Sequence, residues 1–206
     1  MEVKERIKQK ADELFMRYGI KSITMDEIAT QLGISKKTIY QSFADKDELV
    51  DEVVTDLLAY NKDRCDNARS ESLNAIQEVL FSMELLEEMF ENMNPTILFD
   101  LERNHPQTFK KFLHHKYSYL LEIIKQNIEK GISEELYRDD INAEVAAKVR
   151  LETMMLPFNQ EIFPKNKFNL VELEKQLIEY YLFGMASLKG HKIILKYQQE
   201  RLKSIT

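Results

Sequence analysis

The 206-residue chain contains only five Gly and four Pro, so it has few of the residues that form tight turns. A β-sandwich, a barrel or a doubly wound sheet needs many such turns, and average usage would give roughly 25 of these two residues. The hydrophobic share of 44% and the charged share of 31% are those of a folded globular chain. The single cysteine, Cys65, excludes an internal disulfide and an all-cysteine metal cluster. The composition therefore predicts an all-α protein.

The charge distribution is uneven along the chain. Of the net charge of −6, residues 1–43 carry +2 and the remainder carries −8. We therefore expect only the N-terminal segment to approach a polyanion. The longest apolar run, 180–188, is too short to cross a bilayer, and the first residues do not form a secretory signal. The sequence predicts a cytoplasmic protein without membrane contact.

Apolar residues recur at helical spacing nearly throughout, and no segment has a convincing strand pattern. The first predicted helix ends at Gly19, the second begins at Thr24 and stops at Gly33, and the third runs from Ser35 to about Phe43. A long fourth helix opens at Asp45. The later helices are predicted at about 72–92, after Pro95, at 106–131, 143–156, 170–189 and 191–203, with a loop around Pro157 and Pro164 and a break at Gly190. We expect two domains, 1–48 and 49–206.

Residues 24–43, TMDEIATQLGISKKTIYQSF, have the layout of a helix-turn-helix. Thr24 with Glu27 forms a capping box, and the small Ala29 lets the following helix approach closely. Gly33 can take the left-handed conformation that the tight turn needs, at a position where other residues would lose roughly 1–2 kcal/mol. The pattern predicts two short helices packed at an angle.

Helical geometry predicts which residues of the second helix face the core and which face solvent. With Ile39 facing the core, Lys37 and Gln41 lie on the outermost strip, at roughly 100° per residue. Thr38 and Tyr40 lie to either side, where a helix in a major groove would meet the flanking backbones. The first turn carries no acidic residue, as expected for a helix that faces an anion. Eight residues are the candidate DNA contacts: Thr24, Ser35, Lys36, Lys37, Thr38, Tyr40, Gln41 and Lys46.

Three stretches within residues 24–49, TMDEIA, LGISKKTIYQSF and DKDEL, resemble the DNA-binding domain of the tetracycline-repressor-like (TetR) transcriptional regulators. The resemblance implies that Thr38 and Tyr40 contact phosphates, that Lys46 matches a lysine at the start of the fourth helix, and that Thr24 matches a backbone-contacting residue. Lys37 replaces the glycine common in the family. Beyond about residue 60 only the helical layout is similar. An ordinary solvated surface would explain the same polar residues without DNA binding.

Signatures of enzymes are absent from the sequence, which has no glycine-rich phosphate loop, no serine elbow and no His-Glu-x-x-His motif. His114 and His115 are adjacent on a helix and point about 100° apart, so they cannot chelate one metal together. We therefore predict no catalytic activity, no metal and no cofactor.

Soft and aromatic side chains are concentrated in the middle of the chain. Methionine adapts its shape and often lines promiscuous cavities, although ordinary core packing would explain the same residues. The family resemblance implies a ligand pocket here for a small apolar effector. Its candidate lining is Met89, Phe90, Met93, Phe99, Phe109, Phe112, Tyr117, Met154, Met155 and Phe158.

The helix predicted at 170–189 is apolar nearly all round, which indicates burial on more than one side. In TetR-like proteins the last two long helices pair with those of a second subunit. The candidate interface is Leu173, Leu177, Tyr181, Leu182, Met185 and Leu188. The sequence thus predicts a homodimeric, ligand-released repressor that binds a palindromic operator in double-stranded DNA. A helical protein-interaction adaptor and a small-molecule-binding bundle without a DNA role are the alternatives.

Overall fold

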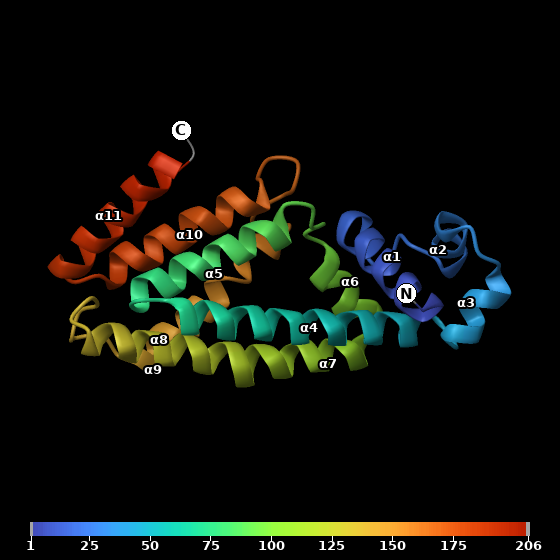
Figure 1. The fold of residues 1–206 in the computed structure, drawn as a ribbon, viewed down its shortest axis with the longest axis horizontal. Coiled ribbons are helices and arrows are strands. Elements are labelled where there is room, and N and C mark those ends of the chain that lie inside the picture. Colours follow the sequence, from blue (N-terminus) through green and yellow to red (C-terminus); the bar gives the residue numbers. More distant parts are fainter. Residues whose placement is uncertain (1, 205–206) are drawn as a thin grey trace. The chain divides into compact units, whose positions relative to one another are not determined.

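The computed structural model describes residues 2–204, and its regular elements are all helical (Figure 1). They are α1 (Val3–Tyr18), α2 (Met25–Leu32), α3 (Lys36–Ser42), α4 (Lys46–Glu71), α5 (Ala75–Phe90), α6 (Ile97–Asn104), α7 (Pro106–His114), the π-helix η1 (His115–Leu120), α8 (Leu121–Ser133), α9 (Ala143–Thr153), the 3₁₀ turn η2 (Leu156–Phe158), α10 (Leu170–Met185) and α11 (Leu188–Ser204). The predicted all-α class is confirmed. Among the described residues, no helix is long and apolar enough to cross a membrane.

Side-chain caps fix the starts of several helices where the sequence predicts them. Thr24 Oγ1 accepts a hydrogen bond from the Glu27 amide at 3.2 Å at the start of α2. Asn142 and Asn169 accept corresponding bonds at α9 and α10, at 3.1 and 3.0 Å. Each bond satisfies one of the amides that a helix start leaves without a partner. These starts follow from local chemistry alone.

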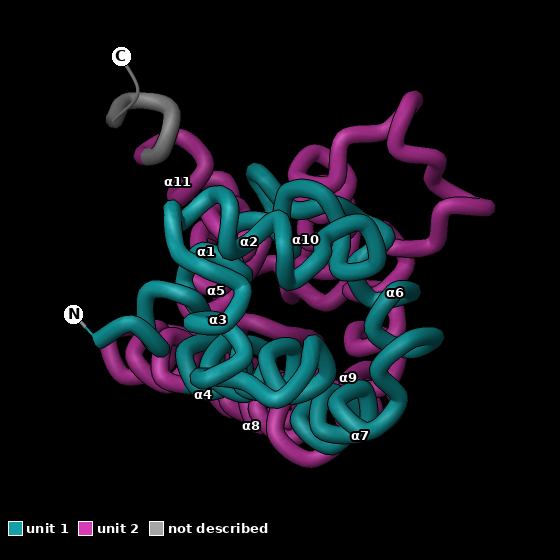
Figure 2. The backbone as a smooth tube through the Cα atoms, turned by 90° about the vertical axis from the view of Figure 1, so that its right-hand side faces the viewer, with its two compact units in different colours: residues 1–62, 90–115 teal, residues 63–89, 116–206 magenta. Residues whose placement is uncertain are grey.

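The chain divides into two compact units, residues 1–62 with 90–115, and residues 63–89 with 116–206 (Figure 2). The first contains α1–α3, the beginning of α4, α6 and α7. The second contains the end of α4, most of α5, and η1 through α11. The boundary after residue 48 stays a prediction about which segment binds DNA.

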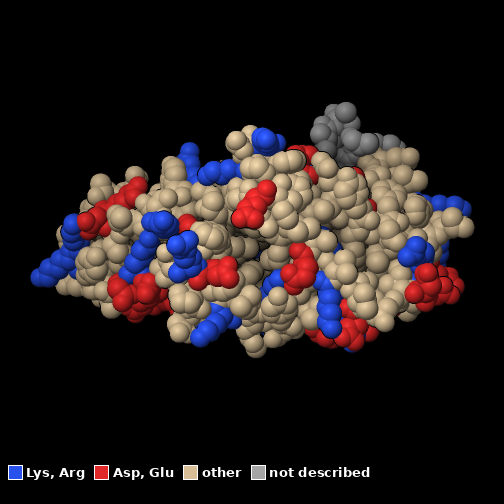
Figure 3. Space-filling view, turned by 180° about the vertical axis from the view of Figure 1, so that it is seen from behind, with Lys and Arg blue, Asp and Glu red and all other residues tan. Residues whose placement is uncertain are grey.

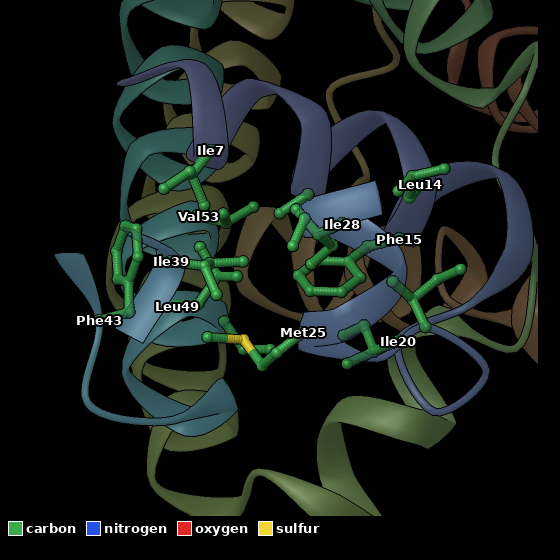
Figure 4. Packing of buried hydrophobic residues seen from close by; sticks show 14 of the residues in the cluster. Ile7, Leu14, Phe15, Ile20, Met25, Ile28, Ile39, Phe43, Leu49 and Val53 are labelled. Carbon is green, nitrogen blue, oxygen red and sulfur yellow. The ribbon is translucent and has the colours of Figure 1, made fainter. Parts of the chain in front are cut away.

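The core of the first unit is built by α1 to α4. Ile7, Phe15, Ile28, Ile39 and Leu49 are at most 2% exposed, and their side chains point toward one another (Figure 4). Burying a side chain of this size contributes about 1.5–3 kcal/mol relative to leaving it in water. This packing holds α3 against the other helices and leaves its opposite side in solvent.

Helices α6 and α7 belong to the same unit as α1–α3. Leu101 of α6 is 4% exposed and lies in the core just described. Asp100 accepts a hydrogen bond from the Lys21 amide at 3.0 Å, close to the C-terminal end of α1. His105 Nδ1 lies 2.7 Å from Asp47 Oδ1 at the start of α4. Residues 90–115, which follow residues 63–89 of the other unit in the chain, therefore complete the N-terminal unit.

Asp12 on α1 has a buried carboxylate oxygen, Oδ1, without a hydrogen bond to the described residues. Burial raises its pKa to about 6. Because this lies above the unfolded value of about 4, folding disfavours the ionised form, and stability falls as the pH rises from about 4 to 6. We expect Asp12→Asn to raise the free energy of unfolding by about 1–2 kcal/mol at pH 8 and to change it little at pH 4. Urea unfolding at the two pH values measures this effect.

The control for this prediction is Glu13→Gln, because Glu13 is the neighbouring residue and its side chain is 57% exposed. We expect it to leave the difference between pH 4 and pH 8 unchanged. An equal gain at both pH values for Asp12→Asn would show that burial of the charge is not the cause.

The second unit packs α5, α8, α9 and α10 around Ile76, Ile128, Ala147 and Ile178, each at most 1% exposed. The helix predicted over 170–189 is interrupted, because α10 ends at Met185 and α11 begins at Leu188. The backbone between them pairs with a distant segment. The Arg138 amide donates to the Met185 carbonyl at 3.0 Å, and the Ser187 amide donates to the Leu136 carbonyl at 2.9 Å.

The break predicted at Gly190 is wrong, since this residue lies inside α11. A Cβ there would lie 2.0 Å from the Leu136 carbonyl oxygen, so the glycine permits a close helix–backbone contact. Gly131 does not end its helix either, and α8 continues to Ser133. A Cβ at Gly131 would lie 2.1 Å from the Tyr137 ring. Both glycines serve packing rather than chain reversal.

Candidate nucleic-acid interface

The turn between α2 and α3 has the predicted geometry. Gly33 adopts the left-handed conformation, with φ 65° and ψ 30°. Its amide donates to the Thr30 carbonyl at 3.1 Å, and the next amide, of Ile34, donates to the Ala29 carbonyl at 3.0 Å. These bonds satisfy carbonyls that the end of α2 would otherwise expose. The turn is therefore tight and fixed.

The angle between the two helices is set by small and branched side chains. Ala29 is 2% exposed and Ile39 is fully buried, while Ile34 packs against the same core from the turn. A larger residue at position 29 would push α3 outward. The packing thus presents one face of α3 to solvent in a fixed orientation.

The N-terminal end of α3 faces solvent with a positive character. Ser35 Oγ caps it by accepting from the Thr38 amide at 3.1 Å and lies 2.9 Å from the Thr38 hydroxyl. The first turn has no acidic residue, and both Lys36 and Lys37 are exposed. A helix N-terminus carries about half a positive charge, which adds to these lysines and favours an anion.

The remaining candidate contacts on α3 lie where the helical geometry placed them. Lys37 and Gln41 are exposed on the outer strip, Tyr40 is 50% exposed, and Thr38 is half-buried beside Ser35. Thr24 is exposed at the cap of α2. The structure leaves all of these polar groups at least partly exposed, and their DNA contacts stay predictions.

Lys36 has a partner that helix periodicity does not reveal. Its ammonium group forms an ion pair with the carboxylate of Asp26 on α2, and this raises the lysine pKa. Because both side chains are exposed, the pair adds little to stability. The Asp26 carboxylate would therefore compete with any phosphate for the Lys36 ammonium group.

Lys46 is placed differently from the other candidates. Its Nζ donates to the Ile20 carbonyl at 2.6 Å and lies 5.9 Å from the centre of the Phe15 ring. Partial burial lowers its pKa. The ammonium group thus links the start of α4 to the segment after α1. The resemblance of the sequence to the family does not predict this structural role. A phosphate contact would require it to share or exchange the Ile20 carbonyl.

Basic side chains do not gather into one extended patch on the face shown in Figure 3, where Lys and Arg alternate with Asp and Glu. This pattern agrees with the net charge of −6. This face therefore does not offer nucleic acid a broad basic surface.

The ten candidate pocket residues divide between the two units. Phe90, Met93, Phe99, Phe109 and Phe112 lie in the first unit, and Met89, Tyr117, Met154, Met155 and Phe158 in the second. Phe99 is 57% and Tyr117 is 51% exposed, whereas Phe90 is 7% exposed. Phe109 and Phe112 stack with their ring centres 5.8 Å apart. A single cavity lined by the whole set stays a prediction.

The candidate interface residues on α10 have different surroundings. Leu182 and Met185 are 2% and 8% exposed and fill the core of their own unit, because this helix is apolar on more than one side. Leu173, Leu177 and Tyr181 are half-buried, and Leu188, which begins α11, is 86% exposed. Tyr180, which is not among the candidates, is 68% exposed, and a Cβ at Gly184 would meet nothing within 4 Å.

Other chemistry is not supported by the described residues. They contain no group of three or more His, Cys, Asp or Glu side chains that could hold a metal ion. Burial raises the pKa of the Cys65 thiol to about 11, which leaves it protonated and unreactive at neutral pH.

An all-helical chain that presents a capped, exposed second helix across a tight glycine turn has the architecture of a helix-turn-helix DNA-binding regulator. Residues 7–53 match the family described as "Bacterial regulatory proteins, tetR family". The N-terminal segment of the chain therefore carries the DNA-binding domain of this TetR family. Its relatives are transcriptional regulators rather than enzymes, and the protein is accordingly a DNA-binding transcriptional regulator.

Similarity extends beyond the matched segment. The uncharacterized HTH-type transcriptional regulator YvaF of Bacillus subtilis is 25% identical over 171 residues, which cover 81% of this chain and 87% of that protein. A TetR-family regulator from Agrobacterium tumefaciens has the same fold, with a TM-score of 0.73 at 15% identity, covering 89% of this chain and 97% of the other. A transcriptional regulator from Saccharomonospora viridis, solved in complex with choline, gives a TM-score of 0.74 at 18% identity, covering 89% and 97%.

Proposed function

We propose that the protein is a repressor that binds a palindromic operator as a homodimer and leaves it when a small, largely apolar effector binds. Residues 1–48 would be the DNA-binding domain, and residues 49–206 the ligand-binding and dimerisation domain. The observation that carries the DNA part is the fixed α2–α3 turn, which holds Lys37, Tyr40 and Gln41 on one exposed surface. α3 would lie in the major groove.

The homodimer is supported by an exposed apolar surface on the last two helices. Tyr180 and Leu188 are 68% and 86% exposed, and Gly184 between them leaves room for a close approach. One helix-turn-helix offers few contacts, whereas two related by a two-fold axis would bind half-sites separated by about one helical turn or a multiple of it. We propose that Leu177, Tyr180, Gly184 and Leu188 contribute to this contact, and we call them the α10–α11 face.

The apolar character of the effector is supported by the soft side chains in the middle of the chain. The choline held in the Saccharomonospora viridis regulator supports only that a protein of this fold binds a small molecule. Release requires that the effector bind the DNA-free conformation better, by a coupling of typically 1–3 kcal/mol. Operator DNA must then weaken effector binding by the same factor. Effector affinity measured with and without operator tests this mechanism, and identical values would rule it out.

The operator itself is obtained by selecting bound duplexes from a random pool. Affinity for the selected duplex should fall steeply with salt, because phosphate contacts release counterions. An adaptor that used the same surface for a protein partner, or a bundle without a DNA role, would show neither enrichment nor this salt dependence.

Substitutions on α3 should separate base readout from backbone contact. We expect Lys37→Ala and Gln41→Ala to relax preference at particular base pairs by roughly 1–3 kcal/mol each. Tyr40→Phe should weaken binding to all duplexes about equally, since a phosphate contact carries no sequence information. Affinities for the operator and its single-base-pair variants measure both effects.

Lys110→Ala on α7 serves as the control, because this residue is an exposed lysine of the same unit that is not part of the helix-turn-helix. It should change neither affinity nor preference. Full retention of sequence preference by both the Lys37 and Gln41 variants would show that another face of the unit reads the bases.

A further inference from the structure

Three polar atoms are buried without a hydrogen bond to the described residues within the segment 143–185, which we call the α9–α10 segment. They are Arg150 Nη1, Gln160 Nε2 and Glu174 Oε2. Arg150 and Glu174 are only 6% and 3% exposed. More than nine in ten buried polar groups in proteins find a partner, so such atoms in one segment need an explanation.

The arginine and the glutamate form an ion pair through one of the two hydrogen bonds that such a pair can make. Arg150 Nη2 donates to Glu174 Oε1 at 2.9 Å. A guanidinium and a carboxylate can form two parallel bonds, and here the second donor and the second acceptor remain available. The guanidinium carbon lies 5.4 Å from the centre of the Tyr181 ring, which helps to fix its plane.

The pair lies where two helices and their connection meet. Arg150 follows the buried Ala147 by one turn on α9, and Glu174 precedes the buried Ile178 by one turn on α10. The turn η2, in the connection that also contains Gln160, packs against both helices. The half-buried Met154 and Met155 begin this connection and can adapt their shape to a neighbouring group.

The charges and free atoms define what this place can bind. Arg150 and Glu174 neutralise each other, so an added ion would remain uncompensated in a buried site. The free Nη1 needs an acceptor and the free Oε2 needs a donor. A primary carboxamide offers both on one carbon atom and carries no charge.

We propose that the Arg150–Glu174 pair is the polar end of a site for a neutral small molecule with a carboxamide head and an apolar tail. The inference rests on the proposed function and gives the effector a specific chemistry, since a purely apolar compound would leave these atoms unbonded. Glu174 accepts from the amide N–H, Arg150 donates to the amide carbonyl, and the tail lies against apolar side chains of the second unit.

The test uses linear primary amides from butanamide to decanamide with the full-length protein. Calorimetric titration and thermal unfolding should show saturable binding of at least one member of the series. The carboxylate and the ammonium compound of equal chain length should bind at least about tenfold more weakly, because each brings a net charge into the site.

The decisive variant replaces both members of the pair, Arg150→Met with Glu174→Met. A buried ion pair can often be exchanged for apolar side chains without loss of stability, whereas a single substitution would strand one charge. We expect this variant to unfold at a temperature similar to the parent and to bind the amide at least about tenfold more weakly.

The matched control is the Lys130–Glu78 pair of the same unit, whose N–O distance is 3.0 Å and which has no unbonded buried atom. Lys130→Met with Glu78→Met should leave amide affinity unchanged. The proposal is overturned if no amide in the series binds, or if the Arg150/Glu174 variant binds it as tightly as the parent. Either result assigns the pair a structural role with water on its free atoms.

The experiments distinguish failure of the proposed amide site from failure of the proposed function. Amide binding that depends on Arg150 and Glu174 but does not release operator DNA would keep the site and refute effector control. Operator binding by a protein that binds no amide would keep the DNA-binding function and refute the site.

Discussion

Tyr180→Glu combined with Leu188→Glu is expected to convert the protein into a folded monomer that binds the operator at least about 100-fold more weakly. Both side chains are exposed in the single chain, at 68% and 86%, so the substitutions do not disturb its core. Two facing copies would place charges in an apolar contact. Loss of the second helix-turn-helix removes the avidity of linked sites, which is commonly 10²–10⁴.

Sedimentation gives the oligomeric state, and titration of operator duplex gives the affinity. Leu73→Glu is the control, because Leu73 is 81% exposed in the same unit but lies outside the α10–α11 face. It should remain dimeric with full affinity. A wild-type protein that is monomeric at micromolar concentration, or a double variant that remains dimeric, would refute the assignment of this face.

The second large effect is expected from a single methyl group. Gly190→Ala places a Cβ 2.0 Å from the Leu136 carbonyl oxygen, which belongs to backbone and cannot rotate away. Helix propensity alone favours alanine by about 1 kcal/mol. The clash should outweigh this gain and lower the free energy of unfolding by about 2–4 kcal/mol, in the range of severe overpacking.

Gly184→Ala is the same chemical change, but we expect it to raise the free energy of unfolding rather than to lower it. This position lies inside α10 and a Cβ there meets nothing within 4 Å, so we expect a gain of about 0.5–1 kcal/mol. Urea unfolding of both variants in the Tyr180→Glu, Leu188→Glu background removes any contribution of subunit association. Similar effects at the two glycines would show that packing against Leu136 is not what requires Gly190.

Features that depend on neighbouring residues were predictable from the sequence. The caps at Thr24, Ser35, Asn142 and Asn169 and the left-handed Gly33 all involve atoms within a few positions of one another. Each of these contacts joins residues within a few positions of one another, and the helix-turn-helix is built largely from contacts of this kind.

Features that depend on distant segments were not predictable. The helix expected through residue 189 is broken at its end because the backbone around Ala186 bonds to residues 136–138. Lys46 bonds to a carbonyl 26 residues earlier. Periodicity also cannot say which side of an all-round apolar helix meets its own core, and so it does not show that Leu182 and Met185 are buried within the single chain.

A fusion protein that takes its DNA-binding segment from one regulator and the rest of its chain from another must keep the parts of the first unit together. Leu101 contributes to the core beneath α1–α4, Asp100 bonds to the Lys21 amide, and Thr108 donates to Asp51 at 3.0 Å. A chimera that transplants only the first 62 residues would separate these partners. Residues 1–62 and 90–115 would have to be exchanged together, because the compact unit that contains the helix-turn-helix is not a contiguous segment of this chain.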